Sequence, residues 1–76
     1  MHRLDATGLL CPLPVLRTAR LVEGLAAGEV VEVVGDDPTL PADLEAWCAT
    51  TGHRLVAVES LAGGAFRCRL EIVKKT

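Results

Sequence analysis

Apolar residues change their spacing along this chain, and the order of these spacings limits the folds that it can adopt. From Pro12 to about Gly24 the spacing is that of a helix with one buried face. Its apolar positions are Val15, Leu16, Ala19 and Val22. A second helix is predicted from Leu40, Leu44, Trp47 and Cys48. We place its cap at Thr39 rather than Asp37, because Pro41 suits a first helical turn, and its end at Gly52.

Segments with the residue types and alternation of β-strands lie between and after the two predicted helices. The run from Glu29 to Val34 is dense in β-branched residues and stops at residues 35–38, Gly-Asp-Asp-Pro. Two further strands are predicted, Arg54 to Ser60 and Ala65 to Val73, joined by a glycine-containing reversal at residues 61–64. In the last strand apolar and charged residues alternate. One face has Phe66, Cys68, Leu70 and Ile72, and the other has Arg67, Arg69 and Glu71.

A short strand around Leu4 completes the order strand, helix, strand, helix, strand, strand. Each helix has one apolar stripe, and the last strand has one apolar face. The expected fold is therefore an α/β two-layer sandwich, with two helices packed on one face of a four-stranded mixed sheet. The other face of the sheet is expected to stay open. A chain of 76 residues has room for a single domain, residues 1–76, without a linker.

Composition excludes several classes of function. Half of the residues are hydrophobic but only Trp47 and Phe66 are aromatic, so an ordered aliphatic core is expected. The net charge of -2 gives no broad positive field, which disfavours direct binding to nucleic acid. No apolar run approaches the roughly 18 residues of a membrane span, and the first residues lack the apolar stretch of a secretion signal. A cytoplasmic protein without a membrane partner is therefore expected.

The sequence has three widely spaced cysteines, Cys11, Cys48 and Cys68. Their number and spacing fit neither a disulfide framework nor a zinc site with paired Cys-x-x-Cys ligands. We therefore expect free thiols and no metal site, and a function carried by a thiol alone would require no cofactor. Cys48 lies on the apolar stripe of the second helix and Cys68 on the apolar face of the last strand, so both are interpreted as core residues.

Cys11 stands apart, because it precedes two prolines at the start of the first predicted helix. If Pro12 is the first helical residue, Cys11 is the N-cap, and Pro14 stiffens the same turn. A residue before proline is driven to extended geometry, which would turn the sulfur toward solvent. The positive end of the helix dipole would then favour the thiolate. The same restriction acts on Leu13 and would move the helix start by one or two residues.

Two interpretations of Cys11 are about equally supported by the residues alone. A lone cysteine is usually a small buried hydrophobe, and a nearby proline usually marks only the start of a helix. Cysteine is nevertheless an unusual cap where Ser, Thr, Asp or Asn would serve better, and Pro14 reinforces the geometry. The second interpretation is a reactive thiol.

The chain resembles the TusA/SirA-like family of small sulfur carriers from about Leu4 to Val73. The resemblance lies in Leu4-Asp5-x-x-Gly8-Leu9-x-Cys11-Pro12-x-Pro14-Val15, with Gly28-Glu29 before a strand and Asp36-Asp37-Pro38 after it. It implies a two-layer α/β sandwich similar to the C-terminal domain of translation initiation factor three. It also implies that Cys11 carries sulfane sulfur as a persulfide, while Pro12 and Pro14 shape its cap.

The family resemblance further implies a relay between proteins. A cysteine desulfurase or a rhodanese-like protein would donate sulfur to Cys11, and an acceptor protein would receive it. The chain would act as a sulfurtransferase-type carrier rather than as a self-contained enzyme. Leu13 stands where tRNA-thiolating members of the family have an acidic residue, which speaks against that pathway. Molybdenum-cofactor chemistry and sulfur oxidation are the other pathways that the resemblance leaves open.

Other residues near the thiol have candidate roles. Asp5 and Gly8 are expected to shape the loop before Cys11, and loop capping is favoured over proton transfer for Asp5. Asp36 and Asp37 are interpreted as a turn and a helix cap rather than as an acid/base pair. A partner-docking surface has the candidates Leu9, Leu10, Leu13, Arg17 and Arg20. A solvated helix face explains the arginines equally well.

Two other functions stay open as alternatives. A redox-sensing or regulatory interaction module would use the same exposed thiol through sulfenate or disulfide chemistry. RNA binding, which the translation-factor-like fold suggests, is opposed by the acidic charge balance, and fold analogy alone is a weak guide to function. The charged outer residues of the last strand favour a monomer.

Overall fold

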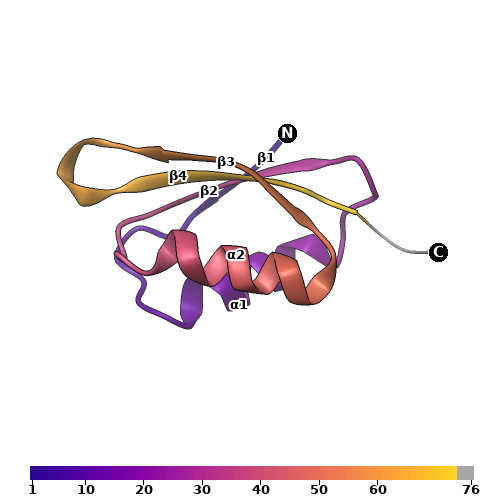
Figure 1. Cartoon of the computed structure of the whole chain (residues 1–76), viewed down its shortest axis with the longest axis horizontal. Coiled ribbons are helices and arrows are strands. Elements are labelled where there is room, and N and C mark those ends of the chain that lie inside the picture. Colours follow the sequence, from indigo (N-terminus) through magenta and orange to yellow (C-terminus); the bar gives the residue numbers. More distant parts are fainter. Residues whose placement is uncertain (74–76) are drawn as a thin grey trace.

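The elements of the computed structural model, which describes residues 1–73, follow the predicted order (Figure 1). The strands are β1 His2–Asp5, β2 Val30–Gly35, β3 Arg54–Ser60 and β4 Phe66–Glu71, and the helices are α1 Leu13–Val22 and α2 Leu40–Thr51. A short 3-10 turn, η1 Ala62–Gly64, joins β3 to β4. The predicted sandwich is confirmed, because both helices lie on one face of a four-stranded mixed sheet. Within residues 1–73, no helix is long and apolar enough to pass through a membrane.

The sheet has the strand order β1-β2-β4-β3. β1 runs parallel to β2, whereas β4 pairs antiparallel with both β2 and β3. A parallel pair needs a crossover connection, and α1 supplies it between β1 and β2. The chain therefore leaves β1 and β2 at the same end of the sheet, where Asp5 is paired with Val34. The segments that follow these two strands begin side by side.

The core lies between the sheet and the two helices. Strands β2 and β4 contribute alternate residues to it, and α2 contributes residues at helical spacing. The buried apolar side chains of these elements are Val31, Val33, Cys68, Leu70, Leu40, Leu44 and Cys48. The predictions that Cys48 and Cys68 are core residues are thereby confirmed. Burial of this aliphatic surface is the main favourable contribution to folding.

Helix α1 buries a face that matches the predicted one only in part, because Val22 is buried and Val15 packs against the core as predicted, whereas Leu16 does not. Pro14, Thr18 and Val22 are buried at intervals of four residues, whereas Leu16 is 57% exposed. Placing Leu16 in the core was therefore wrong. Pro14 and Thr18 point inward instead, and the Thr18 hydroxyl donates a hydrogen bond to the Pro14 carbonyl oxygen at 2.8 Å. That internal bond satisfies the buried hydroxyl and lets a polar residue occupy the core side.

The start of α1 is also one residue later than the first prediction. Pro12 is the N-cap, with φ -98° and ψ 11°, and Leu13 is the first helical residue. Cys11 therefore lies in the turn before the cap, and the Cys11–Pro12 peptide bond is cis. For α2 the predicted limits are confirmed, because Thr39 is the N-cap and Gly52 ends the helix in the left-handed region.

Gly35 allows the start of α2 to approach the sheet closely. A Cβ atom at this position would lie 2.8 Å from Cδ2 of Leu40 and 3.6 Å from Cβ of Ala6. Leu40 is buried, so its side chain has little room to move away. The last residue of β2 therefore fixes how the following turn and helix sit over the sheet.

We expect Gly35→Ala to lower the free energy of unfolding by about 1–3 kcal/mol, the usual cost of overpacking a core. Urea denaturation measures the change. Gly24→Ala is the matched control, because only a backbone oxygen at 3.9 Å approaches the added Cβ there. The control should be neutral or slightly stabilising. Equal effects at the two positions would contradict the close approach at Gly35.

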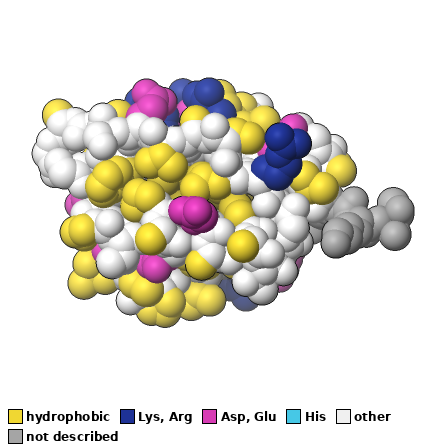
Figure 2. All heavy atoms as spheres, in the orientation of Figure 1, with side chains coloured by type: hydrophobic (Ala, Val, Ile, Leu, Met, Phe, Trp, Pro, Cys, Tyr) yellow, Lys and Arg dark blue, Asp and Glu magenta, His cyan; other side chains and the backbone are white. Residues whose placement is uncertain are grey.

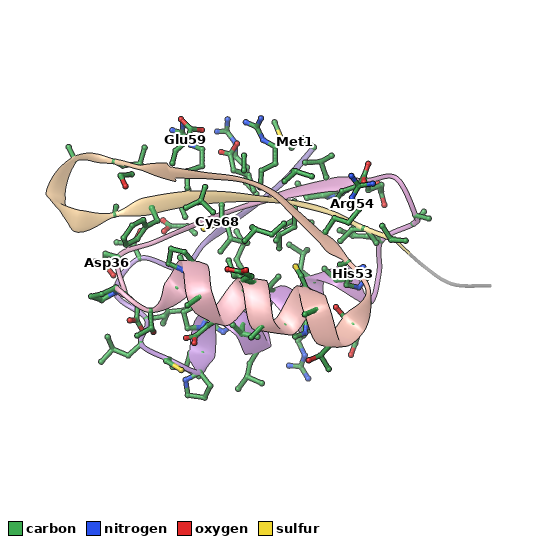
Figure 3. The ribbon with its side chains drawn as sticks, viewed as in Figure 1. Met1, Asp36, His53, Arg54, Glu59 and Cys68 are labelled. Carbon is green, nitrogen blue, oxygen red and sulfur yellow. The ribbon has the colours of Figure 1, made fainter. Side chains whose placement is uncertain are left out.

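The sheet face opposite the helices carries paired charges. Glu32 is only 5% exposed, and its carboxylate lies 3.4–3.5 Å from the guanidinium groups of three arginines. These are Arg3, Arg67 and Arg69. Glu59 extends from the same face of β3 and lies 3.6 Å from Arg67 (Figure 3). Along the upper margin of Figure 2, acidic and basic side chains lie next to one another. The sheet face opposite the helices is therefore a mixed ionic surface.

β3 forms one edge of the sheet, and its pairing with β4 is irregular. The register shifts between Leu55 and Ala57, so Val56 falls outside the regular ladder. Such a bulge increases the local twist and bends the strand. It also places Arg54 and Glu59 opposite residues of one β4 face, where they pair with Glu71 and Arg67.

Candidate functional site

The loop that holds Cys11 lies beside the turn that follows β2. The Ala6 amide continues the β1–β2 pairing by donating to the Val34 carbonyl oxygen at 2.6 Å. Figure 3 shows Asp36 at this end of the molecule, in the turn between β2 and α2. The sequence separates these segments by more than twenty residues, and the parallel pairing of β1 with β2 brings them together.

Two aspartates of the turn bind the backbone of the cysteine loop. The Gly8 amide donates to Asp36 Oδ1 at 3.0 Å, and the Cys11 amide donates to Asp37 Oδ2 at 2.6 Å. The other oxygen of Asp37 accepts bonds at 2.9 Å from the amide and the hydroxyl of Thr39. Asp37 thus joins the backbone of Cys11 to the N-terminus of α2. Thr39 is the cap of α2, and Asp37 closes the turn before it by accepting a hydrogen bond from the Thr39 amide. The side chain of Asp36 instead binds the Gly8 amide of the cysteine loop, which the sequence did not indicate.

Asp5 and Gly8 shape the start of the same loop. The Thr7 amide donates to Asp5 Oδ1 at 3.0 Å, which is the predicted loop capping. Hydrogen bonds from the side chain and the backbone of Thr7 lower the pKa of the Asp5 carboxyl. Gly8 has φ 83°, a left-handed conformation that favours glycine. Both residues therefore act on loop geometry.

Hydrogen bonds also lower the pKa of Asp37, first from the Thr39 amide, then from the Cys11 amide and the Thr39 hydroxyl. A carboxyl whose pKa is lower in the folded state stabilises the fold above its unfolded pKa, and this contribution is lost as the pH falls through the lowered value. We therefore expect stability to fall below about pH 4. Asp37→Asn should flatten this acid limb, as measured by urea midpoints across the acid range. Glu45→Gln removes the same charge from an exposed site and should keep the wild-type slope.

The Cys11 thiol is exposed. Asp37 accepts a hydrogen bond from the Cys11 amide, and the Thr39 hydroxyl lies 2.9 Å from Asp37 and 3.0 Å from Asp43, so both carboxylates belong to this site. The pKa of the thiol is raised, first because the Asp43 carboxylate accepts a hydrogen bond from the protonated thiol. Partial desolvation and the charges of Asp43 and Asp37 act in the same direction. The prediction that the helix start favours the thiolate is therefore wrong. Two prolines leave few free amides at that end of α1, and the carboxylates come from another helix and its preceding turn.

Three exposed leucines lie next to Cys11 in the sequence and on the first turns of α1. Leu10 is 67% exposed, Leu13 44% and Leu16 57%. Leu13 and Leu16 are three residues apart and share one helix face. We call these three residues the leucine patch. Figure 2 shows hydrophobic side chains along the lower margin, where the loop into α1 lies in Figure 1.

The docking candidates of the sequence divide into two groups. Leu10 and Leu13 are exposed beside the thiol, whereas Leu9 packs against the core. Arg17 and Arg20 are exposed and line a shallow hollow with Leu16. Sequence reasoning missed Leu16, because its helical spacing matched the core stripe.

Sequence reasoning also missed the link from Asp37 to the Cys11 amide and the proximity of Asp43 to the thiol. The parallel β1–β2 pairing is the signal that places these segments together. Within residues 1–73, no cluster of three or more His, Cys, Asp or Glu side chains is arranged to hold a metal ion.

Comparisons with known proteins agree on one family. The family model described as Sulfurtransferase TusA matches residues 2–72. YrkF, a candidate sulfur carrier protein of Bacillus subtilis, is 46% identical over 57 residues, which are 75% of this chain and 31% of YrkF. A candidate sulfur carrier protein of Archaeoglobus fulgidus is 36% identical over 75 residues, 99% of this chain and 97% of that protein.

The fold has a close counterpart among solved structures. The crystal structure of a SirA-like protein from Desulfitobacterium hafniense superposes with a TM-score of 0.85 at 25% identity. The superposition covers 97% of this chain and 100% of the other. The family resemblance seen in the sequence is thereby confirmed over nearly the whole described chain. This chain belongs to the sulfurtransferase TusA family.

Proposed function

We propose that this chain is a sulfur carrier that holds sulfane sulfur as a persulfide on Cys11. One observation carries the proposal: of the three cysteines in the sequence, Cys11 alone is exposed, while Cys48 and Cys68 are buried. A carried sulfur atom has to be reached by two other proteins in turn, which requires an open position. The TusA family assignment supports the same role.

Loading and release are two transfers of one sulfur atom. The Cys11 thiolate attacks the outer sulfur of a donor persulfide, a new S–S bond forms, and the donor leaves as its thiolate. The outer sulfur of the resulting Cys11 persulfide is then attacked by an acceptor thiolate, and Cys11 returns to its thiolate. Each step breaks one S–S bond and forms one, so no further oxidant or reductant is consumed.

The chain's own contribution is to hold the sulfur in a fixed place. Asp37 binds the Cys11 amide at 2.6 Å, and Asp36 binds the Gly8 amide at 3.0 Å. The loop is thus tied to the β2–α2 turn at two points. We propose a cysteine desulfurase or a rhodanese-like protein as donor and a protein as acceptor. The carrier works as a monomer in the cytoplasm, where thiols stay reduced.

The proposal is tested by incubation with a cysteine desulfurase and cysteine, and separately with a rhodanese and thiosulfate. The intact chain should gain the mass of one sulfur atom, and dithiothreitol should remove it. Peptide mapping should place the added sulfur on Cys11. Sulfur found on Cys48 or Cys68, or no gain with either donor, would refute the assignment. A sulfenate or a mixed disulfide formed in its place would favour the redox-sensing alternative.

A further inference from the structure

We propose that the proteins that exchange sulfur with Cys11 carry lysine or arginine side chains around their own reactive sulfur. This inference rests on the proposed function and names the chemistry of the partner. Two features of one end of the molecule carry it: the carboxylates near Cys11 and the leucine patch.

In the two segments that hold Cys11 and Asp43, every charged side chain is a carboxylate. Residues 5–16 and 36–43 contain no Lys, Arg or His, and their four carboxylates are Asp5, Asp36, Asp37 and Asp43. The whole chain has a net charge of only -2. Arg17 and Arg20 follow on the exposed face of α1, beside Leu16, and three other arginines are paired with Glu32 on the open face of the sheet. A partner approaching the thiol meets a negative field.

The same carboxylates act against ionisation of the thiol. Asp43 accepts a hydrogen bond from the protonated thiol and thereby raises its pKa, and the charge of Asp37 adds to this effect. The thiolate is nevertheless the nucleophile in sulfur transfer. A lysine or arginine placed beside Asp43 would compete for that carboxylate and offset its charge.

The leucine patch gives this contact an apolar part. Leu10, Leu13 and Leu16 are exposed next to Cys11, and protein interfaces commonly combine an apolar centre with a charged rim. A second copy of this chain would present the same acidic segments, and RNA would present phosphates, so like charges oppose both. The occupant that fits is a protein with an apolar surface facing the leucine patch and basic residues facing Asp43.

The test measures thiol–disulfide exchange of Cys11 with three small disulfides. These are cystamine, which is cationic, bis(2-hydroxyethyl) disulfide, which is neutral, and dithiodiglycolate, which is anionic. The Cys11 thiolate attacks one sulfur, the S–S bond of the reagent breaks, and one reagent thiolate leaves. Mass spectrometry follows the mixed disulfide on Cys11. The rate of each disulfide with Cys11 is divided by the rate of the same disulfide with N-acetylcysteine amide, a small neutral thiol. The intrinsic reactivity of the disulfide then cancels from the comparison.

In the wild-type chain the normalised rate should be about tenfold higher for cystamine than for dithiodiglycolate at about 0.01 M salt. At about 1 M salt the ratio should fall to about twofold. Asp43→Asn should lower the ratio severalfold at low salt and raise the rate with the neutral disulfide at neutral pH. Glu45→Gln removes the same charge from an exposed position of α2 and should leave both values unchanged.

Equal normalised rates for the cationic and anionic reagents in the wild-type chain would overturn the inference. So would a ratio that Asp43→Asn does not change. The salt series uses the wild-type chain, so it still tests the inference if the Asp43→Asn variant folds poorly. A chain that loads sulfur on Cys11 but shows no charge preference would refute this inference and leave the proposed function standing. Failure of the loading assay would instead refute the proposed function.

Discussion

Cys11→Ser should accept no sulfur from either donor system under conditions that load the wild-type chain fully. Serine keeps the size of the side chain and the amide that donates to Asp37, so the loop should keep its geometry. Its hydroxyl is a far weaker nucleophile than a thiolate at neutral pH. The residue is exposed, so the fold should be unaffected. Intact-protein mass spectrometry measures the loss, and circular dichroism checks the fold.

The matched controls are Cys48→Ala and Cys68→Ala, which remove the two buried thiols. Burial raises the pKa of both groups and closes them to a donor protein. Each alanine variant should therefore gain one sulfur atom, as the wild type does. Loading of the serine variant with sulfur, or failure of either alanine variant to load, would contradict the assignment of the carrier role to Cys11.

Leu44→Ala should cost about 2–5 kcal/mol of unfolding free energy, the range for removing a buried leucine from a tight core. Leu44 is 0% exposed and lies at the centre of the face that α2 turns to the sheet. A small domain has a total stability near the low end of about 5–15 kcal/mol. The variant should therefore melt more than about 10 °C lower. Urea and thermal denaturation measure both values, and a loss below about 1 kcal/mol would contradict the described core.

Leu16→Ala is the matched control on the other helix. The side chain is 57% exposed, and leucine and alanine are both good helix formers, so stability should change by about 0.5 kcal/mol or less. The variant should react normally with small disulfides but accept sulfur more slowly from a protein donor, because only the protein contacts the leucine patch. Comparing the two reactions separates a docking defect from a folding defect.

Much of the fold could be predicted from local sequence patterns. The alternation in β4 placed Cys68 and Leu70 inside, because a strand turns successive side chains to opposite faces. The limits of α2 followed from Thr39 before Pro41 and from Gly52, since caps and stops act through neighbouring residues. Strand alternation and helix limits are set by residues that are close together in the chain, so they can be predicted from the sequence.

Helix α1 shows where such patterns stop being sufficient. Hydropathy alone favours Leu16 as a core residue over Thr18, yet Thr18 is buried and Leu16 is exposed. The Thr18 hydroxyl donates a hydrogen bond to the Pro14 carbonyl oxygen within the helix. This bond removes most of the free-energy cost of burying the hydroxyl. Hydropathy spacing treats threonine as polar and contains no information on this bond within the helix, so it favours Leu16 over Thr18 for the buried face.

The electrostatics of the candidate site depend on contacts between distant parts of the chain. Asp37 and Cys11 are 26 residues apart, and Asp43 lies on a different helix from the one that Cys11 precedes. Local reasoning considered only the dipole of α1, whose effect is confined to the first turn. Only the paired strands and the packed helices bring the opposing carboxylates to the thiol.

The irregular register of β3 bears on how this protein behaves in crowded solution. Amyloid-type stacking needs a flat strand with evenly spaced amide and carbonyl groups on its free side. The offset between Leu55 and Ala57 interrupts that spacing, and the added twist turns the strand away from a parallel neighbour. The β3 edge is therefore a poor template for fibre growth, although Val56 and Val58 are exposed on it.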